Sequence, residues 1–485
     1  MSAPQAGLRS VAQRSAVYVL ARVVPSVVML GGIAVLTRTL SPQDYGVYAL
    51  CMSLSVFLYM AAVNWLSSTA VRLHSVFYRT HNLVGSVLAV FGGLLLPLVL
   101  ASVAAMGLVG LADPPLMLLF IPLAVLFAWT EVFSNTAIAR MDARTYGLVQ
   151  VLRTLLATVL AGTFAWLGYG AMGAVAGTAL GFGVIGAWTA GMALVEMRRA
   201  RGRPWAVRDI LGFGLPLGLG YAIAGALTYS DRIILAWFAD PAAVGLYVLA
   251  LDLADKTAKS LVTPIGQASV PSINEALAEQ GREVANRRLA QMLVAVTAIA
   301  LPATVGLALV APALANVVVG PQFRSVLAEL LPIAAAVTLI GVIKANYLDL
   351  AFHLARSTWN FTAATSVHVA IHLGIAFLLI PAFGLWGGIA TLLLSQIVGA
   401  TLVGWFGRRV FVLPLPARQL AKVAAATAAM AGMVLLVQHL EPPDLAPVLS
   451  LTAEVVAGVV AYGAAVVCLD VASLRTFVAR RLRAA

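Results

Sequence analysis

The chain has 485 residues, of which 61% are hydrophobic and only 10% are charged, and its mean hydropathy is +0.97. Soluble domains are roughly 45–50% apolar and about 25% charged, so this composition excludes a soluble enzyme, a disordered protein and a nucleic-acid-binding domain. The apolar runs are long and continuous, whereas the strands of a membrane barrel alternate. At roughly 20 apolar residues per crossing, about 300 apolar residues predict an all-α polytopic membrane protein.

Apolar runs of eighteen residues or more predict about fourteen transmembrane helices. In chain order they fall near 15–36, 44–66, 83–110, 116–138, 146–168, 171–195, 210–238, 243–270, 288–311, 325–350, 359–381, 384–406, 418–439 and 446–469. The net charge is +12 because acidic residues are scarce, and most Lys and Arg lie in alternate connections. This is the positive-inside pattern, and it predicts that both termini are cytoplasmic.

An internal repeat gives the chain its predicted organisation. The pattern P-x-x-x-G-V/L-Y-x-L occurs at Pro42–Leu50 and again 199 residues later at Pro241–Leu249. A second pair of matching segments, Gly170–Ala176 and Gly384–Ala390, is separated by 214 residues. A weaker echo pairs Ala143-Arg144-Thr145 with Ala355-Arg356-Ser357. All three place the first six predicted helices on the next six in the same orientation, as in transporters built from parallel repeats.

We therefore predict three parts in the chain. Residues 1–205 form an N-terminal six-helix bundle, residues 206–410 form a second six-helix bundle, and residues 411–485 add two transmembrane helices and a basic cytoplasmic tail. Two parallel six-helix repeats around a central cavity, with two appended helices, are typical of a transporter.

The two repeat turns also carry a family resemblance. The segment Leu40–Tyr48, and the pair Asp231–Leu235 and Val244–Tyr247, resemble the polysaccharide exporter branch of the multidrug/oligosaccharidyl-lipid/polysaccharide (MOP) superfamily, which includes the Wzx-type O-antigen flippases. The resemblance implies a flippase of the bacterial cytoplasmic (inner) membrane. It would move undecaprenyl-pyrophosphate-linked oligosaccharide to the outer leaflet by alternating access, as part of lipopolysaccharide or exopolysaccharide synthesis. Polysaccharide polymerases and glycosyltransferases would be its partners, together with membrane lipids.

Ionisable side chains inside predicted spans are costly, and they usually face a wet cavity or one another. Cations outnumber acids there, which suits an anionic group such as a pyrophosphate. We predict that the substrate-binding residues are Arg22, Arg153, Lys344, Lys256, Lys259, His368 and His372. The predicted coupling or gating residues are Asp231, Asp252 and Glu131.

Structural interpretations of these residues stay open. Asp252 with Lys256, and Asp255 with Lys259, have the i,i+4 spacing of helical salt bridges. Asp231 equally suits a fixed ion pair with another helix. His368 and His372 also have i,i+4 spacing, but the sequence offers no third metal ligand nearby, so we predict no metal and no cofactor.

Two other functions compete with the flippase. A multidrug and toxin extrusion (MATE-like) antiporter would share the two-bundle plan, but its cavity should be acidic to take organic cations. A membrane-embedded polysaccharide polymerase or ligase would need a large outer loop, and the predicted outer connections are short. The chain has no Gly-x-x-x-x-Gly-Lys phosphate-binding loop and no catalytic arrangement, so we predict a transporter and not an enzyme.

Overall fold

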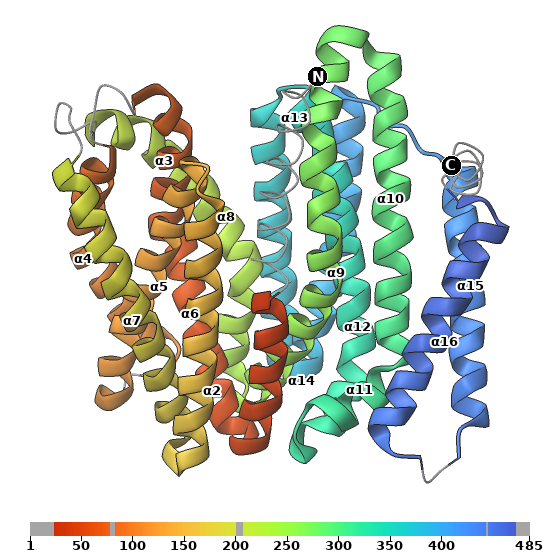
Figure 1. Ribbon diagram of the computed structural model, residues 1–485, viewed down its shortest axis with the longest axis horizontal. Coiled ribbons are helices and arrows are strands. Elements are labelled where there is room, and N and C mark those ends of the chain that lie inside the picture. The colour runs from red at the N-terminus through yellow and green to blue at the C-terminus, as the bar shows by residue number, and fades with distance from the viewer. Residues whose placement is uncertain (1–23, 78–82, 112, 200–206, 443–444, 472–485) are drawn as a thin grey trace, which may run out of the picture. The chain divides into compact units, whose positions relative to one another are not determined.

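The computed structural model describes residues 24–77, 83–111, 113–199, 207–442 and 445–471. Every regular element in these ranges is a helix, as the apolar composition predicts. Within the same ranges, ten helices are long and apolar enough to cross a membrane. The protein is therefore an all-α, multi-pass membrane protein, and Figure 1 labels its helices in chain order.

Two of these ten helices each contain a reversal of the chain. The range Ala143–Arg198 covers two predicted spans, and Trp359–Val410 covers two more. Each is interrupted where a glycine has a positive φ, at Gly168 and Gly170 in the first range and at Gly384 in the second. The predicted number of fourteen stays a prediction, because the first part of the first predicted span lies outside the described residues, and its described part belongs to a shorter helix, Val24–Thr39.

Contacts along the chain divide the protein into two units. The first unit contains the described residues up to Gly245, together with Ala376–Leu385. Its elements are the helix Val24–Thr39, α2 (Pro42–Leu58), η1 (Tyr59–Val63), α3 (Asn64–Phe77), α4 (Leu83–Leu108), α5 (Pro114–Ala139), α6 (Ala143–Phe164), η2 (Ala165–Tyr169), α7 (Gly170–Arg199) and α8 (Val207–Phe238). Here η1 is a single π-helical turn inside a longer helix, and η2 is part of the turn at which the chain reverses between α6 and α7.

Close packing of α6 on α7 explains a row of glycines on α7 (Figure 1). Gly173, Gly177 and Gly181 recur every four residues along α7 and so lie on one face. A Cβ on Gly177 would come within 2.5 Å of the Leu160 backbone, and one on Gly181 within 2.5 Å of the Ala157 backbone. The contacts run in opposite directions along the two helices, so α6 and α7 form an antiparallel hairpin.

The second unit contains Leu246–Ile375 and the described residues from Trp386 onward. Its elements are α9 (Pro241–Glu275, which begins in the first unit), η3 (Ala276–Gln280), α10 (Arg282–Leu309), α11 (Ala311–Val318), η4 (Pro321–Phe323), α12 (Arg324–Ile343), η5 (Lys344–Leu348), α13 (Leu350–Leu354), α14 (Thr358–Val410), α15 (Ala417–Leu440) and α16 (Pro447–Cys468). An apolar core of side chains from α9, α10 and α12, including Val262, Leu293 and Val342, holds this unit together.

The backbone carries the signature of the repeat. The tip glycines Gly170 (φ 57°, ψ −145°) and Gly384 (φ 53°, ψ −126°) share a conformation that suits glycine, at the spacing of the second sequence echo. The helix starts at Pro42 and Pro241 are also alike. Ser41 caps the first through a bond from the Asp44 amide (3.1 Å), and Asp240 caps the second through a bond from the Ala243 amide (2.8 Å).

The third sequence echo falls at equivalent turns of the two halves, but its alignment is shifted by three residues. Met141 (φ 58°) and Arg356 (φ 53°) have the same left-handed conformation. Each lies at the centre of the same set of backbone hydrogen bonds, in which Arg140, Met141 and Asp142 match Ala355, Arg356 and Ser357. Sequence letters had aligned Ala143 with Ala355, because the three-residue pattern is too short to fix its own register.

Candidate functional site

The strongest site in the first unit is a buried ion pair between α5 and α6. Arg153 on α6 contacts the Glu131 carboxylate on α5 at 2.6 Å, and their side chains are only 9% and 19% exposed. The guanidinium also donates to Thr130 (3.1 Å) and Gln150 (2.6 Å). Because a buried charge is costly unless it is paired and hydrogen-bonded, this arrangement holds the cation ready inside the membrane-spanning helices.

Aromatic rings cover the same guanidinium. It lies 5.7 Å from the Phe127 ring and 5.2 Å from the Phe182 ring, so cation–π attraction adds to its binding. Phe127 in turn contacts Tyr59 edge-on, at 5.8 Å between ring centroids. A planar guanidinium that is bound by several acceptors and also contacts two aromatic rings keeps a fixed orientation, as recognition of a phosphate requires.

Tyr59 extends this polar cluster to α3. Its hydroxyl donates to Asn64 (3.0 Å), lies 3.1 Å from the Ser67 hydroxyl and accepts from Asn135 (3.3 Å). Tyr59 is the first residue of the π-helical turn η1. The wider winding of such a turn changes the direction in which side chains point from the helix. The sequence had not marked Tyr59, since a tyrosine in an apolar run looks like ordinary packing.

Asp231 lies apart from this cluster, on α8. It is 1% exposed, and its carboxylate accepts from the neighbouring Arg232 backbone amide at 2.9 Å. The Arg232 guanidinium extends across to Ser53 on α2 (2.8 Å) and lies over the Tyr229 ring. Both charges are thus buried where α8 meets α2.

In the second unit, Lys344 has a partner that the sequence did not suggest. Its ammonium lies 3.3 Å from the Asp349 carboxylate, and the two side chains are 13% and 14% exposed. Five residues separate them, and in an α-helix such residues do not face each other. Here the Asp349 amide bonds to the Lys344 carbonyl (3.0 Å), which is the i→i+5 bond of the π-helix η5. The π-helical turn therefore creates the pair.

The charged stripe on α9 forms one of its two expected bridges in direct contact. Lys259 contacts Asp255 at 2.6 Å, and Asp255 also accepts from Thr338 on α12 (2.9 Å). The Lys259 side chain is 55% exposed. Asp252 and Lys256 lie partly buried on the same helix.

His368 and His372 turn toward the facing leg of α14. Nε2 of His368 and Nδ1 of His372 each lie 3.0 Å from the hydroxyl of Ser395. Both rings are buried. Among the described residues, no group of three or more His, Cys, Asp or Glu side chains is placed to hold a metal ion.

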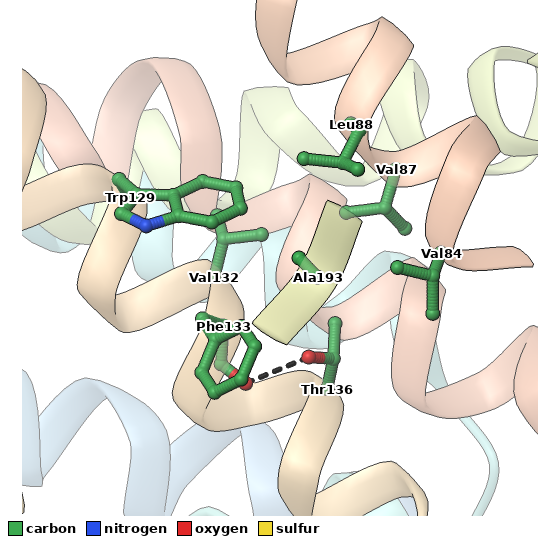
Figure 2. A pocket seen from close by; sticks show the side chains of 8 residues that line it. All are labelled: Val84, Val87, Leu88, Trp129, Val132, Phe133, Thr136 and Ala193. Atoms are coloured by element: carbon green, nitrogen blue, oxygen red, sulfur yellow. Dashed lines mark hydrogen bonds between the residues drawn. The ribbon is translucent and has the colours of Figure 1, made fainter. Parts of the chain in front are cut away.

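The remaining predicted site residue, Arg22, lies outside the described residues. Figure 2 shows a small apolar pocket between α4, α5 and α7. It is lined by Val84, Val87, Leu88, Trp129, Val132, Phe133, Thr136 and Ala193. Its one hydroxyl, on Thr136, already donates to the Phe133 carbonyl (2.7 Å), so the lining offers no charge to an anionic group.

Several partners of the predicted residues were missed because each is uncharged or distant in sequence. Thr130 and Gln150 hold Arg153, and Ser395 bridges the two histidines from at least 23 residues away. A buried acid, Glu454 on α16, was also missed; it accepts from Gln438 on α15 at 3.1 Å. Only Gln150 carried a signal, since it shares a helical face with Arg153.

Comparison with known proteins places this fold. A family model described as "Polysaccharide biosynthesis protein" matches residues 35–328. The structure is similar to that of the lipid II flippase MurJ in an inward closed conformation, with a TM-score of 0.73 at 12% identity, over 93% of this chain and 98% of that one. It is also similar to an outward-facing MATE family multidrug resistance transporter of the MOP superfamily, with a TM-score of 0.53 at 17% identity, over 81% and 94% of the two chains. No curated protein matches the chain.

The family match covers more than half of the chain and spans both repeat turns, from which the resemblance to polysaccharide exporters was inferred. The structural matches show that a flippase and a drug transporter both have a similar fold. The chain therefore belongs to the polysaccharide biosynthesis protein family and has the fold of the MOP exporters.

Proposed function

We propose that this protein is a flippase that moves an undecaprenyl-pyrophosphate-linked oligosaccharide from the inner to the outer leaflet of the bacterial cytoplasmic membrane. Its family makes it a polysaccharide biosynthesis protein, and proteins of its fold are flippases and transporters and not enzymes. The observation that carries the proposal is the buried guanidinium of Arg153, held by acceptors inside the membrane-spanning helices.

Arg153 is suited to a pyrophosphate for two reasons. Its fork of N–H donors matches two phosphate oxygens, and burial strengthens each of these bonds. In the present conformation Glu131, Thr130 and Gln150 occupy donors of this guanidinium. The incoming phosphate replaces the Glu131 carboxylate, and the acid released by this exchange is the coupling group predicted from the sequence.

Other predicted residues enter the proposal in the same roles. Arg22 and Lys344 contact the pyrophosphate, with Lys256, Lys259, His368 and His372 as further substrate contacts, and Asp231 and Asp252 act in gating or coupling. The proposal includes the organisation into bundles 1–205 and 206–410 around a central cavity, followed by two appended helices and a tail (411–485), with both termini cytoplasmic. The polymerase and glycosyltransferases of the same pathway are its proposed partners.

A drug antiporter of the MATE type shares the fold, but the charges do not favour it. An organic cation needs an available acid, and Glu131 is occupied by Arg153. A transport assay in proteoliposomes separates the two functions. A flippase would move the lipid-linked oligosaccharide, whereas a drug antiporter would move the organic cation.

The test is complementation of a strain that lacks its own flippase. We expect Arg153→Ala to abolish export while the protein still inserts, and Arg153→Lys to restore it only in part, because lysine lacks the bidentate fork. Arg287→Ala is the matched control, since it also removes an arginine from an ion pair, but one whose side chains are 65% and 86% exposed. Full export by Arg153→Ala would remove this residue from the mechanism.

A further inference from the structure

The α6–α7 hairpin and the two legs of α14 are equivalent parts of the repeat. Both begin after a residue with positive φ, Met141 and Arg356, and both reverse at a glycine with matching φ and ψ, Gly170 and Gly384. The first segment is one residue longer than the second. The extra residue lies in the tip, because η2 contains a further positive-φ glycine, Gly168, before Gly170, whereas among the described residues of the second tip Gly384 alone has a positive φ.

This alignment gives each residue of the first hairpin a counterpart in the second. Before η2 the numbers differ by 215, so Arg153 corresponds to His368 and Ala157 to His372. After η2 they differ by 214, so Gly181 corresponds to Ser395. In the first hairpin Gly181 packs against the Ala157 backbone, and in the second Ser395 contacts His372. The same contact is thus apolar in one half and polar in the other.

The chemistry at Ser395 is tightly constrained. His368, His372 and Ser395 are 1%, 0% and 1% exposed, so water does not compete for their bonds. A hydroxyl has a single proton, so it can donate to one ring and must accept from the other. Since it contacts Nε2 of His368 and Nδ1 of His372, both neutral rings must carry the same tautomer, either both Nε2–H or both Nδ1–H.

Two further features fit a group that exchanges protons. Nδ1 of His368 is buried with no hydrogen-bond partner among the described residues, so it is a vacant acceptor when the ring carries Nε2–H. The His368 ring also packs directly against Gly399, since a Cβ added to this glycine would overlap the ring. Two titratable groups act electrostatically on His368: His372, and Lys344, which is paired with Asp349.

We propose that His368, Ser395 and His372 form a proton-transfer site in the second unit, at the position where the first unit holds the fixed charge of Arg153. A proton binds Nδ1 of His368, and the ring passes its Nε2 proton to the Ser395 oxygen. Ser395 passes its own proton to Nδ1 of His372, and Nε2 of His372 releases its proton to water that enters when alternating access opens this site. One proton enters, one leaves, and both rings change from the Nε2–H to the Nδ1–H tautomer.

This proposal rests on the proposed transport function only for its purpose, which is to couple proton movement to transport. The protein would then combine a permanent cation for the anionic substrate in one half with a titratable group at the equivalent place in the other. The protonation itself can be measured without substrate, which keeps the two proposals separable.

The direct experiment is nitrogen NMR of the full-length protein in lipid nanodiscs, with ¹⁵N-labelled histidine and each ring assigned by His368→Gln and His372→Gln. We expect both rings to share one tautomer at every pH at which both are neutral. In Ser395→Ala the two tautomers should become independent, whereas Ser395→Thr, which keeps the hydroxyl, should behave as wild type. Rings with different tautomers in the wild type, or unchanged coupling in Ser395→Ala, would overturn the relay.

A second arm measures transport of lipid-linked oligosaccharide in proteoliposomes under an imposed pH gradient. Ser395→Ala and Gly399→Ala should lose the gradient dependence. Gly404→Ala is the matched control on the same leg, since nothing lies within 4 Å of its added Cβ. Unchanged gradient dependence in Ser395→Ala contradicts the relay and leaves the flippase standing. Coupled tautomers in a protein that moves no such lipid contradict the flippase and leave the relay standing.

Discussion

Gly46 and Pro241 lie so close that a Cβ on Gly46 would overlap the carbonyl oxygen of Pro241. The contact is reciprocal, because a Cβ on Gly245 would lie 3.2 Å from the Pro42 carbonyl oxygen and 2.9 Å from Cα of Gly46. Pro42 and Gly46 are the repeat counterparts of Pro241 and Gly245. The two turns therefore lie on one side of the membrane and contact each other as a local two-fold relation requires.

The first prediction concerns this contact. Gly46→Ala should destabilise the protein by about 1–3 kcal/mol, because the added methyl meets backbone and not a flexible side chain. Gly92→Ala on α4 is the control, since nothing lies within 4 Å of its added Cβ. Thermal unfolding of the two variants in detergent gives the comparison. Equal melting temperatures would show that the turns separate freely.

The second prediction separates pairing from binding at Arg153. Removing either partner of a buried pair costs about 3–5 kcal/mol, because it leaves an uncompensated charge, whereas replacing both with apolar residues is often neutral. Glu131→Leu and Arg153→Leu should each lower stability, and the double variant should recover it. Export should stay abolished in the double variant, because the substrate cation is missing. Unfolding and complementation assays on the same three variants test both statements, and recovered export would contradict the binding role.

The third prediction concerns pH at the α5–α6 turn. Asp142 caps α6 by accepting from the Thr145 amide (3.0 Å) and hydroxyl (2.6 Å). Partial burial raises the pKa of the Asp142 carboxyl, but these hydrogen bonds outweigh it and the pKa lies below the ordinary value of 3.8. A lowered pKa means that the cap contributes fully above pH 4 or so and is lost as pH falls through the folded-state value.

Asp142→Ala should therefore cost about 1 kcal/mol at neutral pH, and this difference should shrink in acid. Asp142→Ser keeps a capping oxygen without a titratable group, so its stability should show no such pH dependence. Unfolding measured between neutral pH and pH 3 makes the comparison. A constant difference between wild type and Asp142→Ala across that range would show that the carboxylate charge plays no part.

The fourth prediction concerns topology. The turn at Met141, which is 74% exposed, should face the cytoplasm, and the exposed Gln43 beside the first repeat turn should face outward. In a variant without native cysteines, Cys at position 43 should react with an impermeant reagent in whole cells. Cys at position 141 should react only after permeabilisation. The reverse result would invert the orientation inferred from the positive-inside pattern.

Composition and periodicity alone determined the membrane class and the helical architecture, and the segments Leu40–Tyr48, Asp231–Leu235 and Val244–Tyr247 carried the resemblance to the family. A chain that crosses a bilayer needs long apolar helices, whatever their packing. The loop charges set the orientation of these helices before any tertiary contact forms. The sequence also located Gly170 and Gly384, because only glycine suits the backbone that those two tips require. Arg153 and Glu131 could each be selected as costly charges inside spans, but nothing local indicated that they bind each other.

Tertiary structure decided the pairings that i,i+4 spacing does not predict. Lys344 contacts Asp349 because a π-helical turn changes which residues face each other, and no hydropathy pattern reveals that turn. His368 and His372 share Ser395 because the chain reverses at Gly384, which brings a distant residue into register. The equivalence of His368 with Arg153 likewise needed backbone angles, since the two hairpins differ by one residue and the sequence echo was misplaced by three.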